Sequence, residues 1–339
     1  MMTRSAVLAG LGSWVPPDVV TNETLARRID TSDEWITTRT GIRRRHVVSP
    51  GVSTGDLAVE AGRRALAAAD GIVVDHLVLA TATPDRLCPA TAPDVASRLG
   101  LGPIPAFDIS AVCTGFLYGL QTARAFIAAG LSQAVLLIGA DTFSTYLDPT
   151  DRVTLPIFGD GAGAAVLRAG DADEHGALAA VTLHSDGTLA DLIAVDGGGA
   201  RARSAGSTAP SYLRMQGRST FKRAVRHMED VTRHTLTEAG WRTDDVDHVV
   251  GHQANERILR SLARQLGTDE EKTVLHLRDV GNTAGASIPL ALDHAWRAGR
   301  FAAGDRIVMP AFGAGATWGA AALTWPDLKA PEAPETPGE

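Results

Sequence analysis

Cys113 is the residue of this sequence best placed to act as a nucleophile. Residues 106–116 predict a strand, a sharp turn and the start of a long helix, which puts Cys113 at the helix N-terminus. Because this end of a helix favours thiolate over thiol, we expect the pKa of Cys113 to be lowered. A thiolate here could form a thioester with an incoming acyl group. The segment alone fits a small, buried, hydrophobic cysteine equally well.

His252 and Asn282 could complete a site for carbanion chemistry. His252 falls at the end of the predicted strand 248–252, where α/β folds place their chemistry. Asn282 lies in the Gly-rich loop 279–287, where an ordinary turn residue is the alternative reading. A neutral imidazole and an amide can both donate hydrogen bonds to one oxyanion. The enolate left when a malonyl thioester loses CO₂ needs such donors.

Strand-like and helix-like segments alternate along the chain, which predicts a layered α/β fold with a mixed or parallel sheet. Segment 197–210 is rich in Gly, Ser and Ala, so we expect a mobile loop there, and 326–339 is expected to be a disordered tail. The strand-like segments are 6–11, 76–82, 134–139, 163–167, 248–252 and 307–311, and the helix-like segments are 54–69, 92–99, 114–129, 219–239, 256–266 and 287–298.

Two pairs of segments suggest that the fold is duplicated within the chain. Residues 74–78 resemble residues 246–250, and residues 158–165 resemble residues 312–321, at offsets of 172 (246 minus 74) and 154 (312 minus 158) positions. These similarities predict an N-terminal half, 1–170, that bears the cysteine. They predict a C-terminal half, 171–325, that bears the histidine and the asparagine. Chance similarity of Ala- and Gly-rich strands is the alternative explanation.

Composition narrows the class of protein. The 339 residues are 45% hydrophobic, carry a formal net charge of -7 and include two cysteines. No basic stripe favours nucleic acid as a partner, and no run of about 18 apolar residues predicts a transmembrane helix. We find neither a Cys/His metal-ligand spacing nor a convincing signal sequence. We therefore expect a protein of the cytoplasm that binds no metal and contacts no membrane.

Seven short segments carry a family resemblance that covers about residues 4–325. They are TSDEWITTRTGI at 31–42, DPTDR at 148–152, FGDGAG at 158–163, HSDG at 184–187, HQAN at 252–255, GNT at 281–283 and TWG at 317–319. Together they resemble the β-ketoacyl-acyl carrier protein synthase III family of the thiolase-like superfamily. The resemblance implies a five-layer αβαβα fold, a homodimer and a catalytic triad, whose positions are occupied here by Cys113, His252 and Asn282.

The resemblance also implies a two-step reaction without a cofactor. Acyl-coenzyme A, as a substrate, would acylate Cys113 and release free coenzyme A. A malonyl-carrier protein would then lose CO₂, and its carbanion would attack the acyl thioester. The product would be a β-ketoacyl-carrier protein that starts a fatty-acid or polyketide chain.

Further residues match positions that bind coenzyme A or the carrier protein in this family. Trp35 and Arg152 resemble the residues that sandwich the adenine, and Arg39 and Asn255 resemble others along the coenzyme A channel. An indole face and a guanidinium suit a purine and its phosphates.

Lys222 and Arg257 match the family's docking positions for the acidic carrier protein. Arg257, Arg260 and Arg264 share one face of the predicted helix 256–266. For Arg260 and Arg264, an ordinary solvated helix face is the equally open reading.

Two departures from the family pattern bear on specificity and catalysis. Cys88 precedes Pro89 where primary-metabolic relatives often carry a bulky aromatic in the partner subunit's acyl pocket, so we expect room for a primer larger than acetyl. Cys88 itself lies on a loop without a helix start and is not expected to act in catalysis. Ala314 stands where many relatives have glycine. Its N–H would form the oxyanion hole with that of Cys113, but alanine disfavours a positive φ.

Four other functions remain to be weighed. One is an acyltransferase of the same fold with a non-malonyl acceptor, against which Asn282 argues. Another is a starter-unit synthase for polyketides, which Cys88 slightly favours. A non-catalytic scaffold is disfavoured by the intact triad. A thiolase is disfavoured because no second cysteine follows Cys113.

Overall fold

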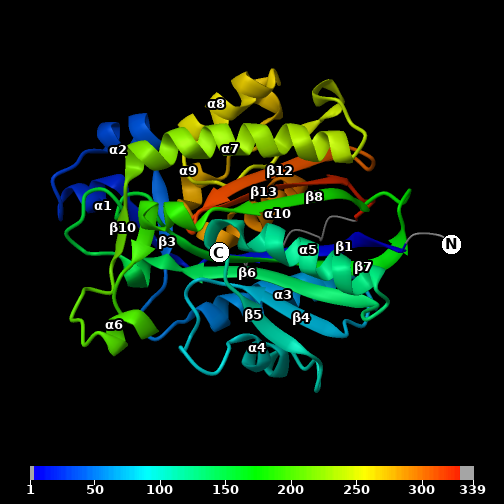
Figure 1. The fold of residues 1–339 in the computed structure, drawn as a ribbon, viewed down its shortest axis with the longest axis horizontal. Coiled ribbons are helices and arrows are strands. Elements are labelled where there is room, and N and C mark those ends of the chain that lie inside the picture. The colour runs from blue at the N-terminus through cyan, green and yellow to red at the C-terminus, as the bar shows by residue number, and fades with distance from the viewer. Residues whose placement is uncertain (1–3, 329–339) are drawn as a thin grey trace, which may run out of the picture.

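The computed structural model describes residues 4–328, whose strands form two main sheets (Figure 1). The first sheet has the strand order β1 (Arg4–Trp14), β7 (Asp160–Asp171), β6 (Ala134–Thr142), β4 (His76–Ala80), β5 (Ala106–Ile109). The second has the order β8 (Leu178–Ser185), β13 (Thr317–Thr324), β12 (Arg306–Gly313), β11 (His248–Val249).

The two sheets repeat one pattern of strand directions. β7 is antiparallel to both β1 and β6, while β4 is parallel to β6 and β5. In the second sheet β13 is antiparallel to both β8 and β12, and β11 is parallel to β12. A parallel bridge from Val249 to Thr273 continues the second sheet on the other side of β11, as β5 continues the first. This repetition agrees with the similarities in the sequence, whereas a division at residue 170 stays a prediction.

Helices occupy three layers around the two sheets (Figure 1). α3 (Thr54–Ala68) and α4 (Ala92–Arg98) cover the outer face of the first sheet. α5 (Gly115–Ala128) and α10 (Ser287–Arg297) lie between the sheets. α7 (Gly217–Glu238) and α8 (Glu256–Leu266) cover the outer face of the second sheet. The layers confirm the predicted αβαβα fold class.

The core follows from where each helix lies. The central helices meet a sheet on each side, so α5 and α10 bury most of their apolar residues, including Leu117 and Leu292. The outer helix α8 buries only one stripe, which contains Leu259 and Leu262, and keeps arginines on the solvent side. The loops between these layers carry the residues with reactive side chains.

Shorter elements complete the structure around the ends of the sheets. The helices are α1 (Asn22–Ala26), α2 (Asp33–Thr40), α6 (Ala200–Ser204) and α9 (Leu277–Val280), and the two small strand pairs are β2 (Asp18–Thr21) with β3 (Arg44–Val47) and β9 (Ile193–Val195) with β10 (Leu213–Met215). Single turns of 3-10 helix are η1 (Val112–Thr114), η2 (Phe143–Tyr146), η3 (Gly187–Leu192), η4 (Thr243–Asp245), η5 (Glu270–Lys272) and η6 (Ala284–Ala286).

Three local predictions differ from the structure. The predicted strand 248–252 is shorter, because β11 ends at Val249 and the chain continues to His252 without strand pairing. The helix predicted from residue 114 begins at Gly115, after a 3-10 turn that contains Cys113. The loop predicted at 197–210 contains the helix α6. The predicted tail, 326–339, lies mostly outside the described residues.

Neither a membrane-spanning helix nor a metal cluster was found in residues 4–328. No helix there is both long and apolar enough to cross a bilayer. The same residues contain no group of three or more His, Cys, Asp or Glu side chains that could hold a metal ion.

Candidate active site

One cavity of about 680 Å³ brings the three predicted catalytic residues together. Cys113, His252 and Asn282 all line it, although the first follows the first sheet's β5 and the second follows the second sheet's β11. They are 6%, 4% and 4% exposed, so water has little access to them. The wall is largely apolar and includes Phe143, Ile157, Phe158, Ile193, Met228 and Phe312. The cavity can therefore accept an apolar acyl chain beside a thiol and two hydrogen-bond donors.

A strained turn presents Cys113 to this cavity. Val112, just before it, has a φ of 48°, a left-handed conformation that is costly for a β-branched residue. Gly313 packs directly against the cysteine, because a Cβ there would lie 3.0 Å from the Cβ of Cys113 and 3.1 Å from its backbone nitrogen. Thr114 donates a hydrogen bond to the Thr317 hydroxyl at 2.7 Å. These contacts fix the cysteine turn against the second sheet's Gly-rich loop.

The prediction of a lowered pKa for Cys113 is wrong for this structure. Burial, followed by the charge of the Asp141 carboxylate, raises the pKa of the thiol to about 12. The helix start cannot offset this, because α5 begins two residues further on and the thiol is removed from water. The resting cysteine is therefore a thiol and must lose its proton during acyl transfer.

Two hydrogen bonds fix the orientation of His252. Its backbone N–H donates to the Pro310 carbonyl at 2.8 Å, and its Nδ1 lies 2.7 Å from the Ser287 hydroxyl oxygen. That oxygen also accepts the Gln253 N–H at 3.4 Å, and it keeps its hydrogen and a second lone pair for Nδ1. Donation of the hydroxyl hydrogen to Nδ1 would place the imidazole proton on Nε2. Burial lowers the pKa of His252 to about 4, so the ring is neutral at pH 7.

The carboxamide of Asn282 is oriented by its own loop. Its Oδ1 accepts a hydrogen bond from the Ala284 N–H at 2.9 Å, which leaves its NH₂ group to donate. The backbone of Asn282 bonds to Ile157 and Gly159, so the loop is tied to the chain that leads into β7. Asn282 is thus held as a donor in the cavity that contains His252.

Ser287 is a site residue that the sequence analysis missed. It is the last residue of the Gly-rich loop and the first of α10, and it looked like a helix-start residue only. Nothing in the 35 positions that separate it from His252 indicated their contact. A hydroxyl at the start of a helix that follows a candidate loop was the only signal available.

Ala314 does not carry the backbone strain that the sequence suggested. In the Gly-rich loop the left-handed φ, 131°, falls on Gly315, and Ala314 is not among the residues with positive φ. Its carbonyl accepts a hydrogen bond from the Thr317 hydroxyl at 3.1 Å. Ala314 is half-buried and does not line the cavity, so its role in an oxyanion hole stays a prediction.

Three of the four residues predicted to bind coenzyme A line the same cavity. They are Trp35, Arg39 and Asn255. The guanidinium carbons of Arg39 and Arg152 lie 4.7 and 5.4 Å from the centre of the Trp35 ring. Arg152 does not line the cavity and pairs with Asp30 at 2.9 Å.

The Asn255 side chain is already engaged in local hydrogen bonds. Its Oδ1 accepts the Arg257 N–H and its Nδ2 donates to the Arg39 carbonyl, at 2.8 and 2.9 Å. It caps α8 and joins it to α2. Any contact with a ligand must share or replace these bonds.

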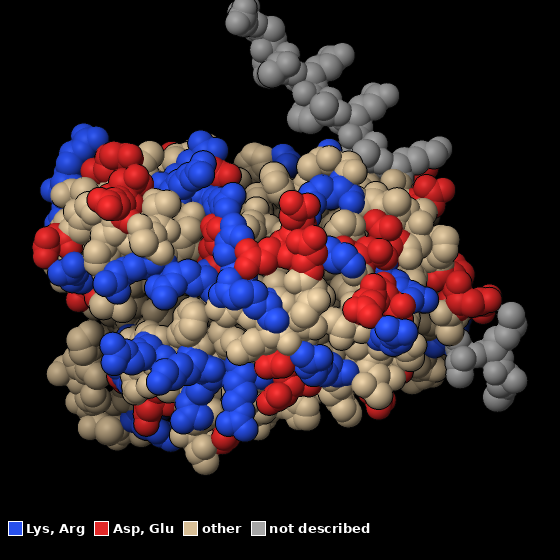
Figure 2. Space-filling model, turned by 90° about the horizontal axis from the view of Figure 1, so that it is seen from above, with Lys and Arg blue, Asp and Glu red and all other residues tan. Residues whose placement is uncertain are grey.

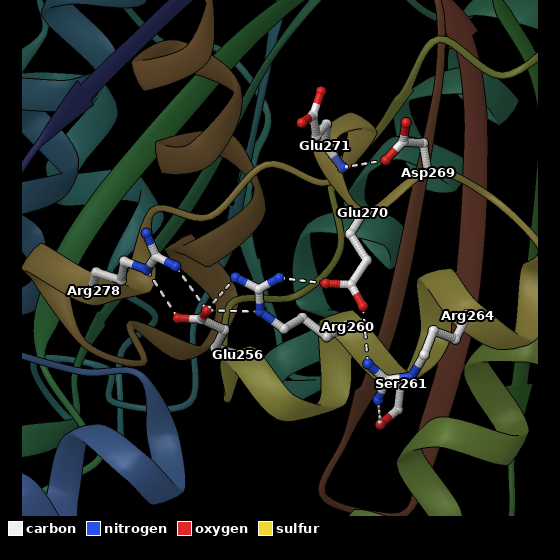
Figure 3. Close-up of polar contacts among 8 residues, drawn as sticks. All are labelled: Glu256, Arg260, Ser261, Arg264, Asp269, Glu270, Glu271 and Arg278. Carbon is white, nitrogen blue, oxygen red and sulfur yellow. Dashed lines mark hydrogen bonds and ion pairs between the residues drawn. The ribbon is translucent and has the colours of Figure 1, made fainter.

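The basic residues of α7 and α8 fall into two groups. Lys222 and Arg257 are exposed and line the cavity. Figure 2 shows Lys and Arg side chains gathered on the face that is uppermost in Figure 1, where α7 and α8 lie. Arg260 instead lies between Glu256 and Glu270, and Arg264 pairs with Glu270 at 2.9 Å (Figure 3).

These ion pairs support the solvated-face reading of Arg260 and Arg264. Cys88 is exposed on its loop and does not line this chain's cavity.

Fold and cavity together define a thiolase-like, acyl-transferring condensing enzyme, and comparison with known proteins narrows this class. The family models for 3-oxoacyl-[acyl-carrier-protein (ACP)] synthase III and for its C-terminal part match residues 107–187 and 236–325. The chain belongs to this family of β-ketoacyl-[acyl-carrier-protein] synthases.

Individual relatives match over nearly their full length. The β-ketoacyl-[acyl-carrier-protein] synthase III 5 of Streptomyces coelicolor is 55% identical over 332 residues, which are 97% of this chain and 100% of the relative. The crystal structure of 3-oxoacyl-(acyl carrier protein) synthase III from Pseudomonas aeruginosa PAO1 has a TM-score of 0.91 at 49% identity, over 96% of this chain and 99% of that one.

A polyketide enzyme is also among the structural relatives. The priming β-ketosynthase from the R1128 polyketide biosynthetic pathway has a TM-score of 0.91 at 34% identity, over 97% of this chain and 98% of that one.

Ser287→Ala should slow the decarboxylation of a malonyl-carrier thioester about tenfold, the effect of losing one hydrogen bond that orients His252. The measurement is the rate of CO₂ release by the purified enzyme. Ser204→Ala, which changes an exposed serine of α6, serves as the control and should be neutral. An unchanged rate for Ser287→Ala would show that this hydroxyl does not set the tautomer of His252.

Proposed function

We propose that this chain condenses an acyl primer, taken from acyl-coenzyme A and held on Cys113, with a malonyl-carrier protein. The observation that carries the proposal is the single cavity shared by Cys113, His252 and Asn282. The membership of the synthase III family supports the same reaction. We further propose a homodimer that works in the cytoplasm and needs no cofactor.

The first step loads the enzyme. The sulfur of Cys113 attacks the carbonyl carbon of the primer thioester, and the bond from that carbon to the sulfur of coenzyme A breaks. The proton lost by Cys113 ends on the released coenzyme A. The backbone N–H groups of Cys113 and Ala314 would stabilise the negative charge on the carbonyl oxygen.

The second step forms the carbon–carbon bond. The malonyl group loses CO₂, and the electron pair of the broken bond becomes an enolate. Nε2–H of His252 and the NH₂ group of Asn282 would donate hydrogen bonds to its oxygen. The enolate carbon then attacks the acyl carbonyl, the bond to Cys113 breaks, and the sulfur takes up a proton.

The orientation of Asn282 favours this reaction over transfer to a non-malonyl acceptor. Its Oδ1 is occupied by the Ala284 N–H, so the side chain faces the cavity as a donor. A second donor beside His252 is useful where an enolate must be stabilised and has no equivalent role in simple acyl transfer.

Polyketide initiation is the second candidate, and it differs only in the substrates. The similarity to the priming β-ketosynthase of the R1128 pathway supports it. The small Cys88 side chain, which we place near the partner subunit's acyl pocket, also supports it.

Asn282→Ala should load an acyl group on Cys113 as the parent does, yet release CO₂ at least about a hundredfold more slowly, because one enolate donor is lost. Intact-protein mass spectrometry measures loading, and trapping of CO₂ measures decarboxylation. Cys113→Ala is the control and should carry no acyl adduct. Unchanged CO₂ release by Asn282→Ala would contradict the proposed role.

Arg257→Ala should raise the KM for the malonyl-carrier protein several-fold and leave loading from acyl-coenzyme A within about twofold of the parent, because no ion pair among residues 4–328 neutralises this exposed cation. Arg264→Ala removes an exposed arginine of the same helix that pairs with Glu270, and it should have a smaller effect. Equal effects of the two substitutions would argue against a docking role for Arg257.

Cys88→Phe should narrow the range of primers by filling space in the partner subunit's pocket. We expect the ratio of long-chain to acetyl loading to fall about tenfold. The check is competition between acyl-coenzyme A thioesters, with the adducts read by mass spectrometry. Cys88→Ala is the control and should keep the range of the parent. An unaltered ratio in Cys88→Phe would place Cys88 away from the primer.

A further inference from the structure

Asp141 is a buried carboxylic acid that the proposed reaction does not use. It lies near the end of β6 and is 0% exposed. Burial raises the pKa of Asp141 to about 7, and the groups that oppose this shift are hydrogen-bond donors rather than a cation. An ionised carboxylate in such a place lowers the stability of the fold. Its presence beside the reactive cysteine therefore suggests a function.

The two oxygens of Asp141 join the loop that follows β4 to the turn that precedes α10. Oδ1 accepts hydrogen bonds from the Ala82 N–H at 2.8 Å and from the hydroxyls of Thr83 and Thr81 at 3.2 and 3.3 Å. Oδ2 accepts the Gly285 N–H at 2.8 Å, in the turn that follows Asn282. Because all four partners donate, the arrangement suits the carboxylate and not the protonated acid.

The Gly285 turn also packs on the turn that bears Cys113. A Cβ at position 285 would lie 3.0 Å from Oδ2 of Asp141 and 3.2 Å from the Val112 carbonyl oxygen. The bond from Asp141 to Gly285 thereby sets the spacing between the Asn282 loop and the cysteine turn. No side chain larger than hydrogen fits between them without displacement.

The charge of Asp141 acts on the titratable groups around it. It is the second cause, after burial, of the raised pKa of both the Cys113 thiol and the Tyr146 hydroxyl. His252 lines the same cavity as Cys113 and is neutral near pH 7. A negative charge nearby disfavours a second negative charge on the sulfur.

We propose that Asp141 is a positioning residue of the condensing site. Its carboxylate holds the turn after Asn282 against the cysteine turn, and its charge adds to burial in keeping Cys113 a thiol between turnovers. A thiol resists alkylation and oxidation, and a sulfur that binds its proton tightly recovers it after each condensation. The proposal rests on the roles given above to Cys113 and Asn282.

Asp141→Asn tests the charge, because the side chain keeps its shape and becomes neutral. Only the thiolate reacts with iodoacetamide, so a lower pKa of Cys113 should speed alkylation at about pH 8 roughly tenfold. CO₂ release should slow, because the NH₂ group of asparagine replaces one of the two carboxylate oxygens. It then faces the N–H of either Gly285 or Ala82 and cannot accept a hydrogen bond from it. The matched control is Asp160→Asn. Asp160 is also fully buried and accepts hydrogen bonds from Ser144 and Val48. Its substitution should leave the alkylation rate of Cys113 unchanged.

Gly285→Ala tests the positioning role while the charge stays in place. It should slow CO₂ release and leave the alkylation rate of Cys113 at the parent value. Equal alkylation rates in Asp141→Asn and the parent would overturn the charge role. Parent-like CO₂ release in Gly285→Ala would overturn the positioning role.

The parent enzyme gives a check that needs no folded variant. Its alkylation rate should still rise between about pH 7 and pH 10, and a plateau below about pH 8.5 would also overturn the charge role. A parent enzyme that acquires no acyl group on Cys113 would instead refute the proposed function, and the alkylation comparison would still stand.

Discussion

The close approach of three backbone turns determines where the reactive groups of this enzyme lie. Gly313, the last residue of β12, packs against the backbone of Cys113, while Gly285 fits between Asp141 and the Val112 carbonyl. Gly139 of β6 packs against the turn that contains Gly285, since a Cβ at position 139 would be 2.5 Å from the Gly285 carbonyl oxygen. Side chains at these glycines would separate the turns. The two sheets and the central helices α5 and α10 therefore position the site by holding small residues at the contacts.

The protonation states of Cys113 and His252 follow from their burial away from water. Burial raises the pKa of Cys113 and lowers that of His252, so the resting cavity holds a thiol and a neutral imidazole. The Ser287 hydroxyl bonds to Nδ1 of His252, and the Ala284 N–H donates to Oδ1 of Asn282. The Nε2 side of His252 and the NH₂ group of Asn282 remain for hydrogen bonds to a substrate. Neutral donors in an apolar cavity stabilise an anion that appears only during reaction, which is the requirement of an enolate mechanism. Asp141 supplies a negative charge that acts on Cys113.

The sequence predicted the fold class well, because apolar periodicity is a local signal, and the three triad residues that it selected line one cavity. Their catalytic roles stay predictions. The helix 256–266 was predicted with the bounds of α8. The pKa of Cys113 was predicted in the wrong direction, because burial depends on how distant segments pack and a helix start does not reveal it. Ser287 was missed for the same reason, since its contact with His252 spans 35 positions. Arg260 pairs with Glu256 of its own helix, a contact that the i,i+4 spacing could have indicated. Both Arg260 and Arg264 also pair with Glu270, which lies beyond the end of α8 and which helix-face geometry alone does not reveal.

Mapping of the acyl group on the unmodified enzyme tests the central claim most directly. The enzyme would be mixed with a panel of acyl-coenzyme A thioesters, quenched in acid and digested, and its peptides would be sequenced by mass spectrometry. The account predicts one acyl group per chain, attached to the sulfur of Cys113, with one free coenzyme A released for each. An acyl group on another residue, or release of coenzyme A without any covalent adduct, would contradict it.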